Sequence, residues 1–348
     1  MISPQLFGLV RCPDCGGAVD RADGAVRCAS CGRAFDDTRG YLDMRPRDAF
    51  VEQTKYLDDA LHQDARHETV SPPLLGSKIR HDMLRRFLAP GPKDRVLDLG
   101  CGSGRTLVWT TDTGAETVGI DISPFFSRDA LERCDLILGD LRRSPLRDDA
   151  FTKAWSLDVL EHLSPEALRG MLSEAHRVLA DDGALFVYTH VRKNGWPAKG
   201  VRLVNQFAHL CERLGLIDLR QERLRKSDHL NPIADHDELA RVTAACGFRI
   251  ERVTYYTPII GALVENVFVR MVERVMSRRA RQGPASENAD AAAVRAARAT
   301  AKARLTRRGW EFRALLALTW IMKLDLVLFG RIQSGPFFAL LKKTSRPA

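Results

Sequence analysis

The sequence predicts an α/β fold in which a parallel sheet carries helices on both faces. Between Asp94 and Gly183, short apolar runs alternate with helical segments at βαβ spacing, a pattern typical of parallel sheets. A glycine-rich turn joins the first of these strands to the helix that follows it. A cysteine-rich segment precedes this core, and a long basic segment interrupts it before the last strand. A chain of 348 residues can hold one large core with such accessory parts.

The cysteine-rich segment, residues 1–44, contains two pairs of cysteines. Cys12 and Cys15 form one CxxC pair, Cys28 and Cys31 form the other, and twelve residues separate the pairs. Each pair makes a tight knuckle that presents two thiolates, and four thiolates form a closed tetrahedral metal site. We expect a zinc ribbon with a structural Zn²⁺; two disulfides or redox iron are the alternatives. The segment is too short for a core of its own, so metal binding should supply much of its folding energy.

Residues 40–44 end this segment as a short apolar strand, Gly-Tyr-Leu-Asp-Met, that could dock on the core. Residues 45–92 follow as a charged, mostly helical connector, broken by Ser-Pro-Pro at 71–73 and Pro-Gly-Pro at 90–92. Its last helix, expected over residues 77–88, leads into the first strand of the core.

The glycine turn follows the apolar strand that contains Asp98. It has the spacing Gly100-x-Gly102-x-Gly104, which differs from both the dinucleotide and the phosphate-loop patterns. Only glycines allow so sharp a bend and so close an approach of a ligand. With Asp98, this turn resembles motif I of the class I S-adenosylmethionine (SAM) methyltransferases. In that family the glycines make room for the amino-acid end of SAM, whose ammonium group suits a nearby carboxylate.

Later motifs follow in the order of the same family. Asp121 ends a second strand at the spacing where a family carboxylate holds both ribose hydroxyls, and Asp140 ends a third strand where the family contacts adenine. Residues 154–163 and 176–185 resemble the fourth-strand and fifth-strand motifs. The resemblance covers residues 93–256 and implies a Rossmann-like, doubly wound, seven-stranded methyltransferase sheet that binds SAM. It assigns the following residues to the cofactor: Asp98, Gly100, Gly102, Gly104, Asp121, Asp140, Leu141 and Ser156.

Beyond the fifth strand, expected over 185–189, the pattern predicts a helix over 201–214, another over 237–246 and a sixth strand over 248–256. The family's seventh strand normally follows at once. Here the next convincing strand lies at 337–342, after an insert.

The insert, residues 257–335, is basic and contains two apolar helical patterns, over 259–276 and 310–329. Residues 270–313 alone carry twelve Arg or Lys and four Asp or Glu, and residues 282–300 between the helices are rich in Ala and Arg. Helices with broad apolar faces and basic flanks can lie in a bilayer interface. Packing on the sheet or on a second subunit is the alternative, so an oligomer is compatible with the pattern.

The predicted organisation therefore has five parts: 1–44 zinc ribbon, 45–92 helical connector or lid, 93–256 SAM-binding core, 257–335 helical insert, and 336–348 last strand and tail. In the resembled family the connector often folds over the cofactor, which makes Tyr56, Arg66 and His67 candidate lid residues. The net charge of +9 permits an anionic partner such as RNA or a phospholipid surface. Without a signal-peptide pattern or a window of about 18 apolar residues, we expect a cytoplasmic protein, peripheral at the inner membrane face.

Methyl transfer from SAM is an in-line displacement in which the protein mainly supplies proximity and alignment. A base is needed only if the acceptor holds its proton at neutral pH, and histidine is the natural candidate. His162, His190 and His229 all fall in loops expected at the carboxyl edge of the sheet, and Asp158 or Glu161 could orient one of them or merely cap the following turn.

Two resemblances point to different acceptors. A zinc ribbon before a methyltransferase domain, with Phe-Asp at 35–36 and Gly-Tyr at 40–41, resembles the ribosomal RNA guanine-N1 methyltransferases, although those enzymes usually have a histidine where this chain has Cys31. The Val-Leu-Glu-His form at 159–162 is similar to the quinone, lipid and small-molecule methyltransferases of the methyltransferase-11 type. We therefore expect methylation of a hydrophobic, lipid-linked or other small-molecule acceptor. Methylation of ribosomal RNA is the second hypothesis, and a non-catalytic SAM-binding or zinc adaptor is the third.

Overall fold

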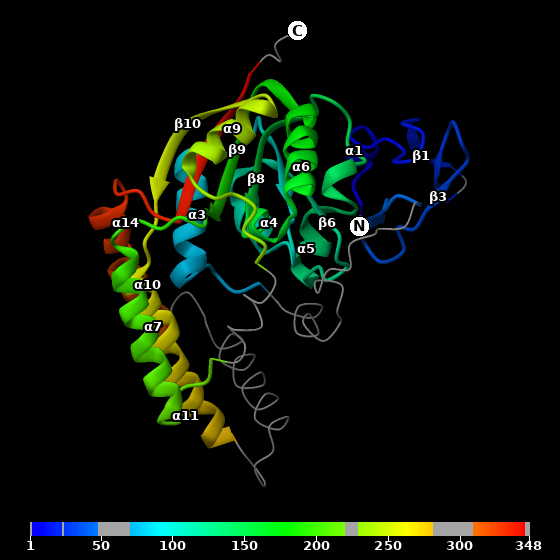
Figure 1. Ribbon diagram of the computed structural model, residues 1–348. Coiled ribbons are helices and arrows are strands. Elements are labelled where there is room, and N and C mark those ends of the chain that lie inside the picture. Colours follow the sequence, from blue (N-terminus) through cyan, green and yellow to red (C-terminus); the bar gives the residue numbers. More distant parts are fainter. Residues whose placement is uncertain (1, 23, 48–69, 220–228, 281–308, 345–348) are drawn as a thin grey trace.

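The computed structural model describes residues 2–22, 24–47, 70–219, 229–280 and 309–344. These residues form a large mixed sheet with helices on both faces, a small N-terminal sheet, and a pair of long helices that extend away from the core (Figure 1). The candidate lid residues Tyr56, Arg66 and His67 and the segment 282–300 lie outside the described residues.

The main sheet has eight strands in the order β10-β11-β9-β8-β5-β6-β7-β4. Their bounds are Leu42–Asp43 (β4), Arg95–Leu99 (β5), Glu116–Asp121 (β6), Asp135–Leu138 (β7), Phe151–Leu157 (β8), Leu179–His190 (β9), Phe248–Tyr255 (β10) and Pro336–Lys343 (β11). Strand β11 pairs antiparallel with both neighbours, and the other pairs are parallel. Chain order reverses between β5 and β8, so a crevice for a ligand is expected at the carboxyl ends of these two strands.

The predicted count of seven strands is wrong, because the N-terminal segment adds an eighth. In β4, Leu42 pairs in parallel with Ile137 and Asp43 with Leu138, and the amide of Met44 donates to the Leu138 carbonyl at 2.8 Å. Leu42 and Met44 are fully buried. The expected docking of residues 40–44 on the core is thereby confirmed, and hydrophobic burial together with main-chain pairing accounts for it.

The rest of the N-terminal segment is a short helix, α1 (Pro4–Phe7), and a three-stranded antiparallel sheet of β1 (Val19–Ala22), β2 (Ala25–Cys28) and β3 (Ala34–Phe35). Its apolar side chains join the main core, so this segment is not a separate body. Ser3 also binds the buried carboxylate of Asp135 through its amide and its hydroxyl.

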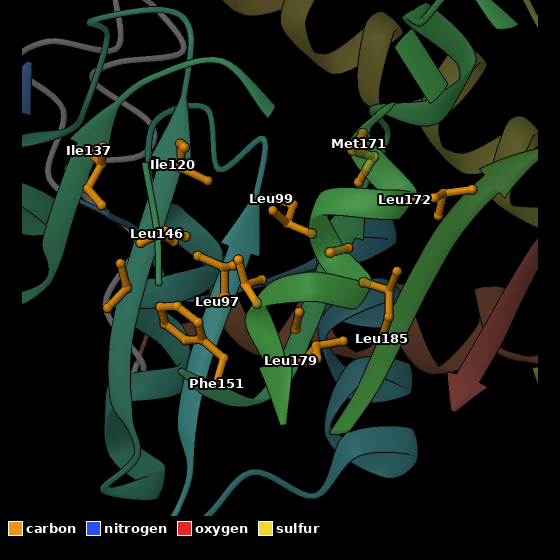
Figure 2. Close-up of a cluster of buried hydrophobic side chains, with 14 of the residues drawn as sticks. Leu97, Leu99, Ile120, Ile137, Leu146, Phe151, Met171, Leu172, Leu179 and Leu185 are labelled. Carbon is orange, nitrogen blue, oxygen red and sulfur yellow. The ribbon is translucent and has the colours of Figure 1, made fainter. Parts of the chain in front are cut away.

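Helices cover the two faces of the main sheet. Their bounds are Leu75–Leu88 (α3), Arg105–Thr110 (α4), Arg128–Arg133 (α5), Pro165–Val178 (α6) and His236–Ala245 (α9). Helices α3, α4 and α5 pack on one face and α6 and α9 on the other. Side chains alternate along the strands, so neighbours such as Val96 and Leu97 enter different cores. Figure 2 shows the second of these cores, where Leu99 and Leu185 of the sheet lie near Met171 and Leu172 of α6.

Most element predictions agree with the structure to within a few residues, but the fifth strand does not. Strand β9 begins at Leu179, six residues before the predicted start, and runs through the segment expected to be a turn. Phe151 pairs with Leu179 and Lys153 with Ala184, so residues 180–183 bulge from the ladder without ending the strand.

The helices after β9 and within the insert are α7 (Ala198–Arg213), α10 (Ile259–Ala262), a π-helical segment (Leu263–Val269), α11 (Arg270–Ala280), α13 (Trp310–Met322) and α14 (Leu324–Phe329). Helix α7 and the α10–α11 run lie side by side and extend beyond the sheet (Figure 1). In the part of the chain that the structure describes, no helix is long and apolar enough to cross a bilayer.

Buried side chains tie the insert to the core. Thr319 accepts a hydrogen bond from the amide of Leu75 at 2.8 Å, and Glu265 accepts one from the amide of Gly76 at 3.0 Å. Asp325, fully buried, accepts from the amides of Ile260 and Gly261 at 3.1 and 2.8 Å. One side of the insert therefore packs on α3 and on itself. This agrees in part with the alternative that the insert packs on the core and does not lie in a bilayer interface.

Replacing Asp325 tests how strongly this packing depends on one side chain. Asp325→Ala leaves two buried amides without an acceptor, so we expect a loss of about 1–3 kcal/mol in the free energy of unfolding. Asp325→Asn keeps one acceptor oxygen and should lose less. Urea denaturation measures both, with the fully exposed Asp181→Ala as the control. Equal stability of all three variants would contradict the anchoring role.

Candidate functional site

The glycine turn between β5 and α4 lies at the reversal point of the sheet. Gly100, Gly102 and Gly104 have φ angles of +82°, +53° and +76°, a region that disfavours residues with a Cβ. A Cβ on Gly100 would lie 2.5 Å from Cγ2 of Val159, and one on Gly104 would lie 2.6 Å from Cβ of Ala130. A Cβ on Gly102 would meet no other residue's atoms within 4 Å, apart from its chain neighbours. Two of the glycines thus permit close packing, and the third borders open space.

Asp121, at the end of β6, holds this turn in place. Its carboxylate accepts hydrogen bonds from the amides of Gly102 and Ser123 at 2.7 and 2.8 Å. Burial raises the pKa of Asp121 above its ordinary value. The Asp121 carboxylate therefore links the end of β6 to the glycine turn, the two motifs that were predicted to bind the cofactor.

Asp98, on the neighbouring strand β5, is buried. Burial raises the pKa of Asp98 to about 8, and the negative charge of Asp121 adds to this shift. Two carboxyl groups close to each other in a poorly solvated place favour a cationic ligand over an anionic one. This is the charge preference expected for a site that receives the ammonium group of an amino acid.

Asp140 and Leu141 lie at the end of β7, where Asp140 caps a short 3₁₀ turn, Leu141–Arg143. Both carboxylate oxygens of Asp140 accept bonds from the guanidinium of Arg142, the closest at 2.8 Å. The predicted adenine contact would have to share this carboxylate with Arg142.

Ser156 has a structural role that the sequence did not indicate. Its hydroxyl is fully buried and donates to the carbonyl of Leu99 at 2.9 Å, linking the ends of β8 and β5. The side chain is committed to this bond, so its influence on a ligand is through the position of the glycine turn.

The structure brings the three predicted histidines together. The ring of His229 lies 4.7 Å from that of His162 and 5.2 Å from that of His190, measured between centroids. Glu161 lies beside them: its Oε1 is 3.9 Å from Nδ1 of His190, and its Oε2 accepts from the Thr189 hydroxyl at 2.8 Å. Burial, followed by the charge of Asp158, raises the pKa of Glu161 to about 8.

Asp158 pairs with a different group from the one expected. Its backbone is left-handed, with φ of +57°, and its carboxylate forms an ion pair with Arg80 of α3 at 3.5 Å. The Arg80 guanidinium also lies over the ring of Tyr188 at 5.5 Å. Burial raises the pKa of Tyr188 above its ordinary range.

Arg80 and Tyr188 were both missed by the sequence analysis. Residues 77–88 were assigned to a connector, and Arg80 stands between buried positions of α3, where a charged side chain is uncommon. This charged residue within an apolar helix face is the sequence feature that could have identified Arg80 as a site residue. Together with Asp158, these residues form a polar wall beside the histidine cluster.

The four N-terminal cysteines lie at the opposite end of the core. Sγ of Cys12 is 3.8 Å from that of Cys31, and Sγ of Cys15 is 3.5 Å from that of Cys28. Bonds of about 2.3 Å to one tetrahedral Zn²⁺ would set sulfurs about 3.8 Å apart, whereas a disulfide is about 2.05 Å long. These distances, with all four thiols free, fit a metal ion and not the alternative of two disulfides.

Backbone amides further favour the thiolate form at one of these positions. The amides of Ser30 and Cys31 point at Sγ of Cys28, at 3.4 and 3.5 Å. Burial works against ionisation there, but these amides lower the pKa of Cys28 to about 6. The thiolate of Cys28 is thus suited to a metal cation, whereas the pKa values of Cys12 and Cys15 are raised in the cluster of free thiols.

Comparison with known proteins agrees with this geometry. Residues 97–187 match the family described as "Methyltransferase domain". A demethylmenaquinone methyltransferase of Tropheryma whipplei (strain Twist) is 31% identical over 166 residues, covering 45% of this chain and 66% of that protein. The 18S rRNA (guanine-N(7))-methyltransferase of Bos taurus is 38% identical over 79 residues, covering 21% of this chain and 28% of that protein. This chain spans less than two thirds of the length of such curated relatives.

Among solved structures, phosphoethanolamine N-methyltransferase 2 of Haemonchus contortus in complex with SAM has a TM-score of 0.50 and 16% identity, covering 85% of this chain and 59% of that one. This likeness concerns the fold. Residues 97–187 therefore match a methyltransferase domain, and this match together with the two methyltransferase relatives named above supports a SAM-dependent methyltransferase enzyme.

Asp121→Ala tests the assignment of the cofactor site. If Asp121 holds both ribose hydroxyls, the variant loses two charge-assisted hydrogen bonds of roughly 1.5–3 kcal/mol each and should bind SAM more than about tenfold more weakly. Calorimetric titration with SAM measures the change. Asp112→Ala is the control, because that carboxylate is exposed and pairs with Arg85. SAM affinity in Asp121→Ala equal to that of the control would refute the assignment.

Proposed function

We propose that this protein transfers a methyl group from SAM to a hydrophobic, lipid-linked or other small-molecule acceptor, and that it meets this acceptor at an anionic membrane surface. The observation that carries the proposal is an exposed apolar surface on helices α7, α13 and α14, near the carboxyl edge of the sheet. The demethylmenaquinone methyltransferase relative acts on a lipid-soluble quinone, which agrees with such an acceptor.

Helix α7 supplies the first part of this surface. Leu203, Phe207, Leu210 and Leu214 recur at helical spacing and are exposed, with Leu203 at 69%. On the other side of the helix, Ala208 and Cys211 are buried in a small core with the π-helical segment. The helix is therefore apolar on two faces, although only one of them has a partner among the described residues. Large exposed apolar patches of this kind mark interaction sites.

Helices α13 and α14 supply the second part. Trp320, Ile321, Leu324, Val327 and Leu328 are exposed at helical spacing, while Met322 and Asp325 of the same segment are buried. The rings of Trp196, two residues before α7, and Phe329, at the end of α14, lie 6.3 Å apart, so the start of α7 lies beside the end of α14. We call the exposed apolar residues of α7, α13 and α14 the apolar surface.

Basic side chains border the apolar surface. Arg202 and Arg213 of α7 and Arg331 after α14 are exposed. Nζ of Lys323 lies 4.2 Å from the ring centroid of Trp320 and also pairs with Asp82 at 2.6 Å. Aromatic and aliphatic residues with a basic margin suit the headgroup region of an anionic bilayer.

The apolar surface is connected to the site by short segments of chain. Helix α7 follows His190 after seven residues, and α10 follows Tyr255 after three. Both start at the carboxyl edge of the sheet, beyond which α7 and α11 extend (Figure 1). An acceptor with an apolar tail could keep the tail at this surface while its reactive group enters beside Tyr188 and the histidines.

In the proposed reaction, Asp98, the three glycines, Asp121, Asp140 and Leu141 hold SAM. The protein aligns the acceptor with the methyl group, and His162, His190 or His229 takes a proton where the acceptor carries one. The ribosomal RNA hypothesis has support from the net charge of +9 and from the rRNA methyltransferase relative. RNA is therefore the second acceptor to test.

We also propose that Cys12, Cys15, Cys28 and Cys31 hold one structural Zn²⁺. With four sulfur ligands the ion has no open position, so it would stabilise the N-terminal segment and take no part in methyl transfer. Through β4, it would also fix the outer strand of the main sheet.

Zinc content and one variant test this second proposal. A thiol-specific reagent should release one equivalent of Zn²⁺ per chain from the native protein and much less from Cys28→Ser. Limited proteolysis should then cut within residues 8–44 of the variant, while SAM binding stays measurable. Cys211→Ser, on α7, is the control and should keep its zinc. Less than half an equivalent in protein purified without chelator would count decisively against zinc.

The double variant Trp320→Glu with Ile321→Glu separates a membrane acceptor from RNA. Both side chains are well exposed, at 60% and 48%, so the fold should persist while the basic residues stay in place. We expect the variant to lose cosedimentation with vesicles containing anionic phospholipid and to lose methylation of a vesicle-borne quinol acceptor. Ala240→Glu with Ala244→Glu, exposed on α9, adds the same charge elsewhere and should retain both.

Two outcomes would overturn the membrane proposal. One is full cosedimentation of the Trp320 and Ile321 variant with anionic vesicles. The other is methyl transfer to naked ribosomal RNA at ordinary enzyme rates by the native protein. Salt dependence alone decides nothing, because both kinds of binding weaken as salt rises.

A further inference from the structure

Three side chains of the histidine cluster are arranged as metal ligands would be. One oxygen of Glu161 and one ring nitrogen each of His162 and His229 lie within 4.8 Å of one another. Two imidazoles and one carboxylate are typical ligands of divalent transition-metal ions in sites that keep positions open for substrate. This spacing is wider than in an occupied site, where bonds of about 2.0–2.2 Å to one ion hold the ligand atoms closer together.

The backbone holds these ligands from two separate parts of the chain. Glu161 and His162 lie in the 3₁₀ turn that follows β8. His229 lies before α9, and the amide of Asn231 donates to the carbonyl of Glu161 at 2.9 Å. Asn231 has a left-handed backbone, with φ of +47°. This bond keeps the segment of His229 against the turn of Glu161 and His162.

Neighbouring groups orient the carboxylate. Glu161 is buried, and the hydroxyl of Thr189 donates to its Oε2, leaving Oε1 on the side of His190. Hydrogen bonds from such neighbours commonly orient a metal ligand and increase its affinity. Within the described residues, the buried amide oxygen of Asn231 has no hydrogen-bond partner, so a further oxygen donor lies two residues from His229.

The cluster also lies close to the predicted methyl donor. Val159, which packs against Gly100 of the glycine turn, is two residues before Glu161. A metal ion held there would be next to the pocket that the resemblance assigns to SAM, on the side of Tyr188 and Arg80.

We propose that Glu161, His162 and His229 bind a divalent first-row transition-metal ion that holds and polarises the oxygen or nitrogen to be methylated. The binding of the ion rests on the structure alone, whereas its role toward the acceptor rests on the proposed function. In the reaction, the bond from the SAM sulfur to its methyl carbon breaks and a bond from that carbon to the acceptor atom forms. Because His162 and His229 are ligands in this arrangement, the acceptor loses its proton to His190 or to solvent, and S-adenosylhomocysteine leaves.

This site differs in chemistry from the four cysteines. Thiolates select Zn²⁺ strongly, whereas imidazole and carboxylate ligands accept Co²⁺, Mn²⁺ or Fe²⁺ as well. A protein whose cysteine site is filled with zinc can therefore be titrated with Co²⁺ to report on the second site.

The test uses the full chain, without an affinity tag and loaded with one equivalent of Zn²⁺. Adding Co²⁺ should give one further bound equivalent, with weak visible absorption and no strong sulfur charge-transfer band. His162→Ala with His229→Ala should bind Co²⁺ at least about tenfold more weakly, and Glu161→Gln should also weaken it. His209→Ala, an exposed histidine of α7, should bind Co²⁺ as the native protein does.

SAM titration of the same proteins shows whether the variants are folded. Co²⁺ binding by the native chain no stronger than by a folded His162 and His229 double variant would overturn the metal site. A Co²⁺ complex with a sulfur charge-transfer band would overturn it as well, because the ion would then lie at the cysteines. If the native chain binds Co²⁺ as expected but methylates only RNA, the metal site stands and the lipid acceptor fails.

Discussion

The hydrogen bond from Ser156 to the carbonyl of Leu99 closes the sheet at the point where its chain order reverses. At such a point, neighbouring helices leave on opposite faces and the strand ends stay uncovered. The bond keeps the ends of β5 and β8 together, so the side chain of Val159 packs against Gly100. The glycine turn then lies beside the turn that carries Glu161 and His162. The glycine turn and the turn of Glu161 and His162 depend on this junction for their relative position.

Much of this arrangement follows from local sequence. Apolar runs of the right length predict β5, β6 and β7, and the spacing of Asp98, the glycines and Asp121 identifies the family resemblance. The three histidines were also expected at one edge, since the ends of parallel strands meet there. What the sequence could not indicate is which polar groups pair. Asp158 binds Arg80 because α3 crosses over this edge, and a contact between residues 78 positions apart leaves no local pattern. The strand at residues 40–44 was predicted, but the sequence could not indicate that it pairs with β7 and so raises the strand count to eight.

The apolar helical pattern of the insert is compatible both with packing on the core and with binding at a bilayer. An apolar helix can pack on the core, lie at a bilayer or do both on different sides. In α13 and α14, buried Thr319, Met322 and Asp325 alternate with exposed Trp320, Ile321 and Leu324. A hydrophobic period detects apolar residues without saying which of them have partners. Only the tertiary contacts to α3 and α10 separate the covered side from the exposed one.

The pairing of β4 with β7 has a consequence for the behaviour of the protein in solution. A strand at the edge of a sheet offers unpaired amides and carbonyls to any other extended chain, and folded proteins commonly protect such edges. Here the N-terminal segment supplies a short, two-residue cover along the apolar strand β7, all four residues of which are buried. If the four cysteines hold a metal ion as proposed, its loss would destabilise this cover. The N-terminal segment would then protect the protein from self-association, and oxidation or chelation at the cysteines would promote aggregation before it removed the activity of each molecule.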